Sequence, residues 1–248
     1  MANTWFQFKQ FTIYQDKCSH KVGTDSILLG SWVNLDNVTK AFDIGSGCGI
    51  LSLMMAQRNP NVKIFGVEID NDSFNQALVN INQSPWADRI SILNTSLQKF
   101  GKNRDKYDLI ITNPPYFINS LPSPNSNRNI ARHAHTLTLH EIIHFTQNHL
   151  EPNGRLALII PTQQFRYFKE IVTIKNFFIY RITKVFPNYN KDSHRMLIEC
   201  GKEKRGFEYD ELVIESNQRH VYTKKYAELT KDFYLNINVE ETELVDTI

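Results

Sequence analysis

The feature that most limits the fold is a short apolar segment that runs into a glycine-rich turn and then into a second apolar segment. Residues 40–44 read as a core strand, residues 45–49 as the turn and residues 50–57 as a helix. Strand, glycine turn and helix in this order form the nucleotide-binding unit of α/β proteins. We therefore predict an α/β domain with a ligand site at this turn.

The spacing of the glycines narrows the type of ligand. Gly45, Gly47 and Gly49 follow a G-x-G-x-G pattern, which differs from the G-x-G-x-x-G pattern of dinucleotide sites. An acid, Asp43, stands directly before them at the end of the strand. A carboxylate at this place can meet the ammonium group of S-adenosylmethionine, so the combination favours this cofactor.

Two further strand ends fit the same cofactor. Glu68 ends a strand over residues 62–68 and stands 25 positions after Asp43 in the chain. An acid at about this sequence distance is expected to accept hydrogen bonds from both ribose hydroxyls. Asp70 is close by, but we expect it to cap the helix over residues 71–82. Ser96 follows a strand over residues 89–94, and its hydroxyl is expected to hold the adenine amino group of the cofactor.

A proline-rich tetrapeptide, Asn113-Pro114-Pro115-Tyr116, follows the apolar strand of residues 106–112. The prolines end the strand and stiffen the chain at the carboxyl end of the sheet, where ligands of α/β proteins bind. The side-chain oxygen of Asn113 and the carbonyl of Pro114 can each accept one hydrogen of an amino group. Tyr116 can stack on a flat ring. These residues therefore predict a site for a planar target with an –NH2 group, and Asn113 also borders the cofactor.

The region after the tetrapeptide is basic. Residues 109–191 contain nine Lys or Arg and three acids, a net +6, although the whole chain carries only +2. The loop over residues 117–136 has no hydrophobic periodicity and contains Arg128, Arg132 and His133. Loops of this length in compact domains are usually functional. We expect these three side chains to bind phosphates of an anionic substrate.

Composition excludes several classes of protein. A chain of 248 residues with 41% hydrophobic residues fits one domain with extensions, and no apolar run approaches the ~18 residues of a membrane span. The N-terminus has no signal-peptide pattern. Cys18, Cys48 and Cys200 are odd in number and scattered, which suits a reducing cytoplasm. Four histidines between positions 133 and 144 have no partner that completes a zinc pattern, so no metal is expected.

The other segments read as parts of the same domain. Alternating aromatic residues near the N-terminus predict a hairpin, and Thr24 or Asp25 is expected to cap the next helix. A turn at residues 152–154 precedes a strand. The predicted helices cover residues 137–150, 161–174 and 223–229, and the later strands cover residues 155–160, 177–186, 194–200 and 210–216.

Taken together, these residues resemble a known family, the tRNA(Val) N6-adenine methyltransferases that modify adenine 37 beside the anticodon. The likeness runs over nearly the whole chain. The tetrapeptide is shared with many amino-methyltransferases, whereas Lys21-Val22-Gly23-Thr24-Asp25 and residues 80–87 are far more specific. The other matching stretches are residues 8–11, 28–30, 43–45, 131–132, 194–195, 222–226, 229–230 and 233–235.

The resemblance implies a Rossmann-like, seven-stranded class I methyltransferase in a single domain. Residues 1–34 would be a small N-terminal hairpin extension that packs on the cofactor and target pocket, and residues 35–248 the methyltransferase domain with a C-terminal strand and helix. It further implies that Lys21, Thr24 and Asp25 belong to that pocket. The substrate would be an anticodon-loop adenine of tRNA, and the protein would be cytoplasmic, without membrane or metal, as a monomer or weak dimer.

Two positions depart from the family pattern, and three other functions remain open. Ser96 stands where an Asp is common, and Ser26 where a Gly is expected.

A protein glutamine methyltransferase also acts on a planar –NH2 group, although the basic region argues against it. A DNA adenine methyltransferase lacks a visible segment for reading duplex sequence. A non-catalytic binding module is disfavoured because the tetrapeptide is intact.

Overall fold

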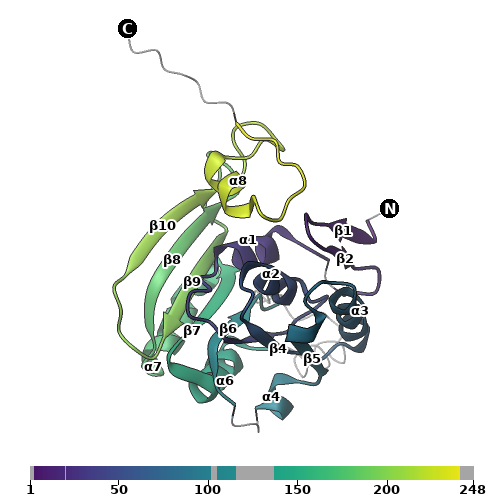
Figure 1. Ribbon diagram of the computed structural model, residues 1–248. Helices are drawn as coiled ribbons and strands as arrows, with labels where there is room; N and C mark the ends of the chain where they lie inside the picture. The colour runs from purple at the N-terminus through teal and green to yellow at the C-terminus, as the bar shows by residue number, and fades with distance from the viewer. Residues whose placement is uncertain (1–2, 20, 102–104, 116–136, 241–248) are drawn as a thin grey trace, which may run out of the picture.

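The computed structural model describes residues 3–19, 21–101, 105–115 and 137–240. Its centre is a sheet in the order β10-β8-β9-β7-β6-β3-β4-β5, which is parallel except for β9 (Figure 1). The strands are β3 (Lys40–Ile44), β4 (Lys63–Glu68), β5 (Ile90–Asn94), β6 (Tyr107–Thr112), β7 (Leu150–Pro161), β8 (Phe178–Phe186), β9 (Arg195–Gly201) and β10 (Glu208–Val213).

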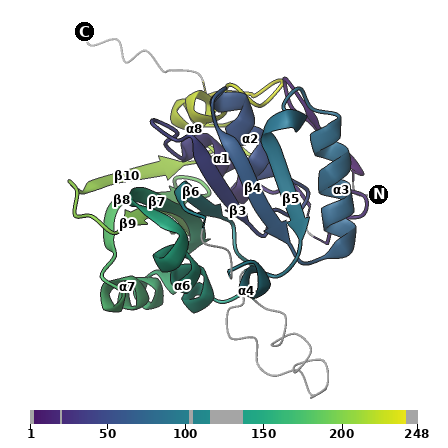
Figure 2. The same cartoon turned by 60° about the horizontal axis from the view of Figure 1, so that its bottom comes forward.

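Helices cover both faces of this sheet (Figure 2). Successive strand residues point to opposite faces, so Ala41 packs with one helical layer and Phe42 with the other. One layer contains α1 (Thr24–Trp32), α2 (Ile50–Arg58) and α3 (Asn71–Asn82), and the other contains α4 (Leu97–Phe100), α6 (Leu139–His149) and α7 (Phe165–Ile174). Short 3₁₀ turns lie at η1 (Ala87–Arg89) and η2 (Thr162–Gln164), and α8 (Lys224–Thr230) lies near the C-terminus. This two-sided burial explains why the central strands are almost wholly apolar.

The Rossmann-like class I fold predicted from the sequence is confirmed, but across the described residues the sheet has eight strands instead of the predicted seven. The eighth strand is β10, which pairs in parallel with β8 through the register Glu208↔Arg181 to Val213↔Phe186. The pairing uses backbone groups of β8 that would otherwise form an open sheet edge. The hairpin of β8 and β9 is also confirmed, because these two strands pair antiparallel.

Two local predictions were wrong. The expected turn at residues 152–154 lies inside β7, which begins at Leu150 and shifts its register against β6 between Tyr107 and Leu109. The N-cap of α1 is Gly23 rather than Thr24 or Asp25, and this cap makes no side-chain hydrogen bond to the helix. The Asp25 carboxylate is engaged elsewhere, since it accepts a hydrogen bond from Arg195.

The N-terminal segment forms the predicted hairpin, with β1 (Trp5–Gln7) antiparallel to β2 (Thr12–Tyr14). Asn80 of α3 fixes the hairpin to the glycine turn. Its side chain accepts from the Tyr14 backbone N–H and donates to the carbonyls of Tyr14 and Cys48, each at 2.9 Å. The other end of the chain packs against the same hairpin, because the Phe8 ring lies edge-on to Phe233 at 6.3 Å between centroids.

Candidate active site

The predicted site residues gather at the carboxyl ends of neighbouring strands. β3 ends at Ile44 and continues into the glycine turn, and β6 ends at Thr112, directly before Asn113. The Thr112 hydroxyl donates to the Ile44 carbonyl at 2.9 Å, and both groups are buried. The start of the glycine turn and the start of the tetrapeptide are therefore held side by side.

The glycine turn leaves open space beside its backbone. Gly45 and Gly47 have φ values of +70° and +55°, and a Cβ added at either would meet no atom within 4 Å. Gly49 differs, because its Cβ would lie 3.6 Å from the Cβ of Ala77 in α3. Positive φ values explain why glycine occupies these positions. The space at Gly45 and Gly47 fits a ligand that approaches the backbone closely.

Asp43 is fully buried, and only half of its carboxylate has a protein partner. Oδ2 accepts a hydrogen bond from the Ser52 hydroxyl at 2.7 Å, whereas Oδ1 has no partner among the described residues. Burial raises the pKa of Asp43 to about 7, and the nearby charge of Glu68 adds to the rise. A buried oxygen without a partner is costly, so this carboxylate fits a cationic or hydrogen-bonding ligand.

The Glu68 side chain forms a hydrogen bond to the backbone of the glycine turn. Its two carboxylate oxygens accept backbone N–H groups of Gly47 and Asp70, both at 2.8 Å, and the side chain is buried. Each carboxylate oxygen has a second lone pair, so bonds to a diol remain possible. This structural role was not foreseen from the sequence, because no local pattern links positions 47 and 68.

Asp70 and Ser96 are both helix caps. Asp70 accepts from the Ser73 backbone N–H at 3.0 Å, as expected for the start of α3. Ser96 accepts from the Lys99 backbone N–H at 3.3 Å and begins α4. The place of Ser96 after a strand predicts a ligand-binding role, and the cap is an additional role that was not foreseen. Beside it, Asn94 donates to the Glu68 carbonyl at 3.0 Å, which ties β5 to β4.

The first turn of α1 contacts the tetrapeptide. Asn113 Nδ2 donates to the hydroxyl of Ser26 at 2.9 Å, and Pro114 is buried. Next to Ser26, the Asp25 carboxylate accepts from Arg195 Nε of β9 at 2.8 Å. Sequence reasoning assigned no site role to Ser26 or Arg195. The only signals were the departure from glycine at position 26 and the position of Arg195 in a matching stretch.

Lys21 and Thr24 have no described contact with the glycine turn or the tetrapeptide. Thr24 is exposed at the first position of α1, and Lys21 Nζ contacts the Asn3 carbonyl at 3.3 Å. Tyr116, Arg128, Arg132 and His133 lie outside the described residues, so their positions relative to Asn113 stay predictions.

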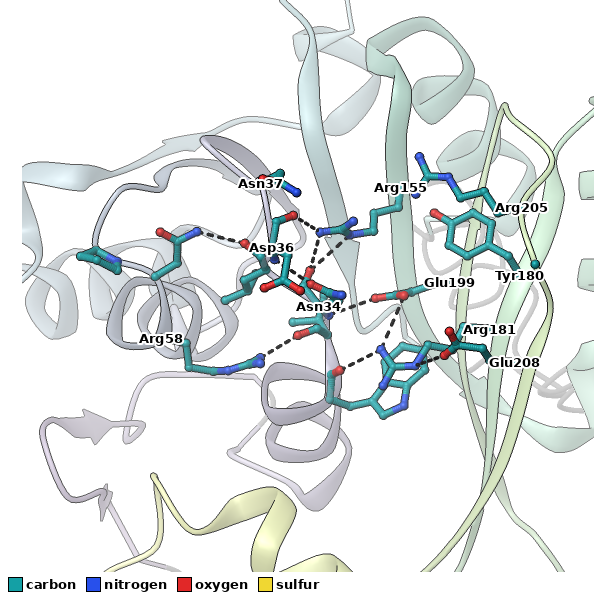
Figure 3. A pocket seen from close by; sticks show the side chains of 16 residues that line it. Asn34, Asp36, Asn37, Arg58, Arg155, Tyr180, Arg181, Glu199, Arg205 and Glu208 are labelled. Atoms are coloured by element: carbon teal, nitrogen blue, oxygen red, sulfur yellow. Dashed lines mark hydrogen bonds and ion pairs between the residues drawn. The ribbon is translucent and has the colours of Figure 1, made fainter.

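A separate pocket of about 880 Å³ lies toward the amino ends of the strands, away from this site (Figure 3). Four arginines line it, but their side chains bind other groups of the protein. Arg58 donates to the carbonyls of Gly30 and Val33, and Arg155 to those of Asn34 and Asp36. The last turn of α1 and the loop after it are thereby fixed, so we regard this pocket as part of the scaffold.

Two other kinds of site are absent from the described ranges. No cluster of three or more His, Cys, Asp or Glu within them could hold a metal ion. Across the same ranges, no helix combines the length and the apolar character needed to cross a membrane.

Comparisons with known proteins identify the family of this chain. Residues 18–181 match the model of the methyltransferase small domain. A tRNA1(Val) (adenine(37)-N6)-methyltransferase of Parabacteroides distasonis is 38% identical over 238 residues, which cover 96% of this chain and 100% of the relative. A relative of the same name from Trichodesmium erythraeum is 40% identical, with 95% and 99% covered.

A solved structure of a "predicted O-methyltransferase" from Agrobacterium tumefaciens superposes with a TM-score of 0.68 at 19% identity. It covers 88% of this chain and 100% of its own. At this identity the likeness concerns the fold alone. The sequence matches reach further, and they show that the chain belongs to the methyltransferase small domain proteins and, within them, to the tRNA1(Val) (adenine(37)-N6)-methyltransferase family.

Proposed function

We propose that this protein transfers the methyl group of S-adenosylmethionine to the N6 amino group of an adenine in tRNA, adenine 37 of a valine tRNA. The observation that carries the proposal is the link between Thr112 and Ile44, which sets Asn113 beside the glycine turn. A group that can hold an amino substrate then lies next to a cradle that can hold the methyl donor. The names of the relatives support the choice of tRNA.

The protein's part in the reaction is to orient a weak nucleophile. The Asn113 side-chain oxygen and the Pro114 carbonyl accept the two hydrogens of N6 and hold them out of the ring plane. The nitrogen lone pair is then exposed toward the methyl group, which the bound cofactor supplies on its sulfonium. The N6 nitrogen would bond to the methyl carbon as the bond from sulfur to that carbon breaks, S-adenosylhomocysteine would leave, and one N6 proton would pass to water. Preorganisation rather than a strong base then lowers the barrier.

The cofactor would be held by groups already described. Asp43 would meet the ammonium of the cofactor and Glu68 its ribose hydroxyls. Gly45 and Gly47 leave room for the cofactor to approach the backbone closely, and Gly49 would complete the turn that holds it. The second lone pair of Ser96 would accept from the adenine amino group of the cofactor. We place Lys21, Thr24 and Asp25 at the rim of the pocket, because the neighbouring Ser26 contacts Asn113.

The substrate would be held by the loop after the tetrapeptide. Tyr116 would stack on the target base, and Arg128, Arg132 and His133 would bind tRNA phosphates, in keeping with the net +6 of residues 109–191. The free energy needed to extrude a base is lower for an anticodon loop than for a duplex. All these groups come from one chain, which supports a monomer or weak dimer, and a tRNA substrate suits a cytoplasmic protein.

The domain division is part of the same proposal. Residues 1–34 would form the extension that closes the pocket over the methyltransferase domain of residues 35–248. The contacts Ser26–Asn113 and Asp25–Arg195 support it, because they join this segment to the ends of β6 and β9.

Incubation with radiolabelled S-adenosylmethionine and bulk tRNA from a strain lacking the gene tests the function. We expect label in N6-methyladenosine after digestion to nucleosides, and far less label in the same time with the Asn113→Ala protein. Label in protein or DNA but not in tRNA would keep the cofactor and discard the substrate. Absence of label in all three would overturn the proposal.

Cofactor affinity is expected to depend on pH through Asp43. Its pKa is about 7 without the cofactor, and the ammonium favours the ionised carboxylate. Below pH 7 binding must therefore release a proton, so the Kd for S-adenosylhomocysteine should fall by up to about tenfold per pH unit from pH 5.5 to 7 and then level off. Calorimetry in two buffers of different ionisation enthalpy measures the released proton. Asp43→Asn should bind more weakly and release none, whereas a flat profile in the unchanged protein would contradict this role.

A further inference from the structure

Ser26 lies on the first turn of α1 and reaches the proposed catalytic amide from outside the tetrapeptide. Its hydroxyl oxygen accepts a hydrogen bond from Asn113 Nδ2 at 2.9 Å in a partly buried position. The two residues are 87 positions apart, so tertiary structure alone brings them together. A glycine at position 26 would have no side chain to make this bond.

The orientation of an asparagine amide is not fixed by its own torsion. The terminal χ2 torsion of Asn is broad and roughly two-fold, so the oxygen and nitrogen ends of the amide can turn or exchange places unless hydrogen-bond partners hold them. If they exchanged in Asn113, an N–H group would face the amino group of the substrate. Two donors would then oppose each other, and the acceptor that the reaction needs would be lost.

The backbone that carries Ser26 is held at both ends of α1. At the start, Asp25 pairs with Arg195 of β9 at 2.8 Å, and the Val22 N–H donates to the buried side chain of Gln15 at 2.7 Å. At the end, the Trp32 indole N–H donates to the Thr183 hydroxyl of β8 at 2.9 Å. The Ser26 hydroxyl is therefore presented to Asn113 from a rigid support.

We infer that Ser26 is a positioning residue that holds the Asn113 amide through the hydrogen bond to Nδ2, with the oxygen end turned toward the amino group of the substrate. The inference rests on the proposed function. Ser26 acts through Asn113, without contact to the reacting atoms. Its contribution belongs to turnover, because the bond governs how the acceptor is presented rather than how the cofactor is held.

A double-mutant cycle tests this role. Ser26→Ala is expected to lower the single-turnover rate with saturating tRNA and cofactor by about 5- to 10-fold, the effect of one hydrogen bond. In the Asn113→Ala background the same change should have no further effect, since no amide is left to orient. The Kd for S-adenosylhomocysteine and the Tm should stay unchanged. The matched control is Ser31→Ala on the same helix, whose buried hydroxyl has no described partner, and it should keep the full rate.

The outcomes separate this inference from the proposed function. If the unchanged protein forms N6-methyladenosine in tRNA and Ser26→Ala reacts equally fast, the positioning role is wrong. It is also wrong if Ser26→Ala slows the reaction by the same factor in both backgrounds, or weakens cofactor binding as much as turnover. If the unchanged protein methylates no adenine at all, the proposed function fails first.

Discussion

Replacing Asn113 with alanine is expected to lower kcat for tRNA methylation by about 10²–10³-fold, the typical cost of removing one preorganised hydrogen-bonding group from an active site. The substituted protein keeps the Pro114 carbonyl but loses the acceptor that Ser26 helps to hold. Rapid-quench single-turnover assays with labelled cofactor measure this loss without interference from product release.

Cofactor binding separates this role from simple damage to the pocket. No described hydrogen bond joins the Asn113 side chain to Asp43, Glu68 or the glycine turn. Because substitutions at sites that share no partner act independently, the Kd for S-adenosylhomocysteine should change less than twofold. Asn113→Asp serves as the matched variant, because it restores acceptor oxygens without the –NH2 group. Its rate should lie between those of alanine and asparagine. An equal loss of cofactor affinity and turnover in Asn113→Ala would sink the role assignment.

Replacing Glu199 with alanine is expected to lower the free energy of unfolding by about 3 kcal/mol, the lower end of the range for breaking a buried ion pair. Glu199 is 3% exposed. One carboxylate oxygen accepts from the Asn34 backbone N–H at 3.1 Å, and the other lies 3.6 Å from Arg181 Nη1. Alanine would deprive that N–H and the guanidinium of this buried partner (Figure 3). Urea denaturation followed by circular dichroism measures the change.

Glu208 provides the control for this prediction, because it also pairs with Arg181 but is 79% exposed at its side chain, with 3.9 Å between the charged atoms. Exposed pairs contribute little, so Glu208→Ala should cost less than about 1 kcal/mol. Similar losses in the two variants would mean that the burial of Glu199 does not matter. In that case the account of the arginine-lined pocket as scaffold would need revision.

The local elements could be predicted well from the sequence, because their signals lie within a few residues of each other. The apolar run before Gly45 and the glycines themselves identified β3, the turn and α2. Asp70 before residues 71–82 identified the start of α3. Failures occurred where a local signal had a competitor. Asp25 resembles a helix cap, but Arg195 binds it. The cap that Ser96 forms on α4 was not foreseen, whereas its ligand role stays a prediction.

The arrangement of the site could be predicted only in part. Parallel topology brings strand ends to one edge of a sheet, and this rule alone is enough to group Asp43, Glu68 and Asn113 in one region. The contacts between side chains from distant segments have no sequence signature. Ser26–Asn113 and Asp25–Arg195 join positions 87 and 170 apart, and they depend on how α1 packs against the sheet.

The packing of Phe8 on Phe233 also bears on when the enzyme becomes active during its synthesis. The Lys9 backbone N–H donates to the Phe233 carbonyl at 2.9 Å, so the N-terminal hairpin needs a partner that leaves the ribosome long after the hairpin itself. Domains generally fold as they emerge, and contacts between distant segments close late. We therefore expect a nascent chain to complete its cofactor-binding half first and to fix the segment that carries Ser26 last. Methylation would then start only after Phe233 has left the ribosome.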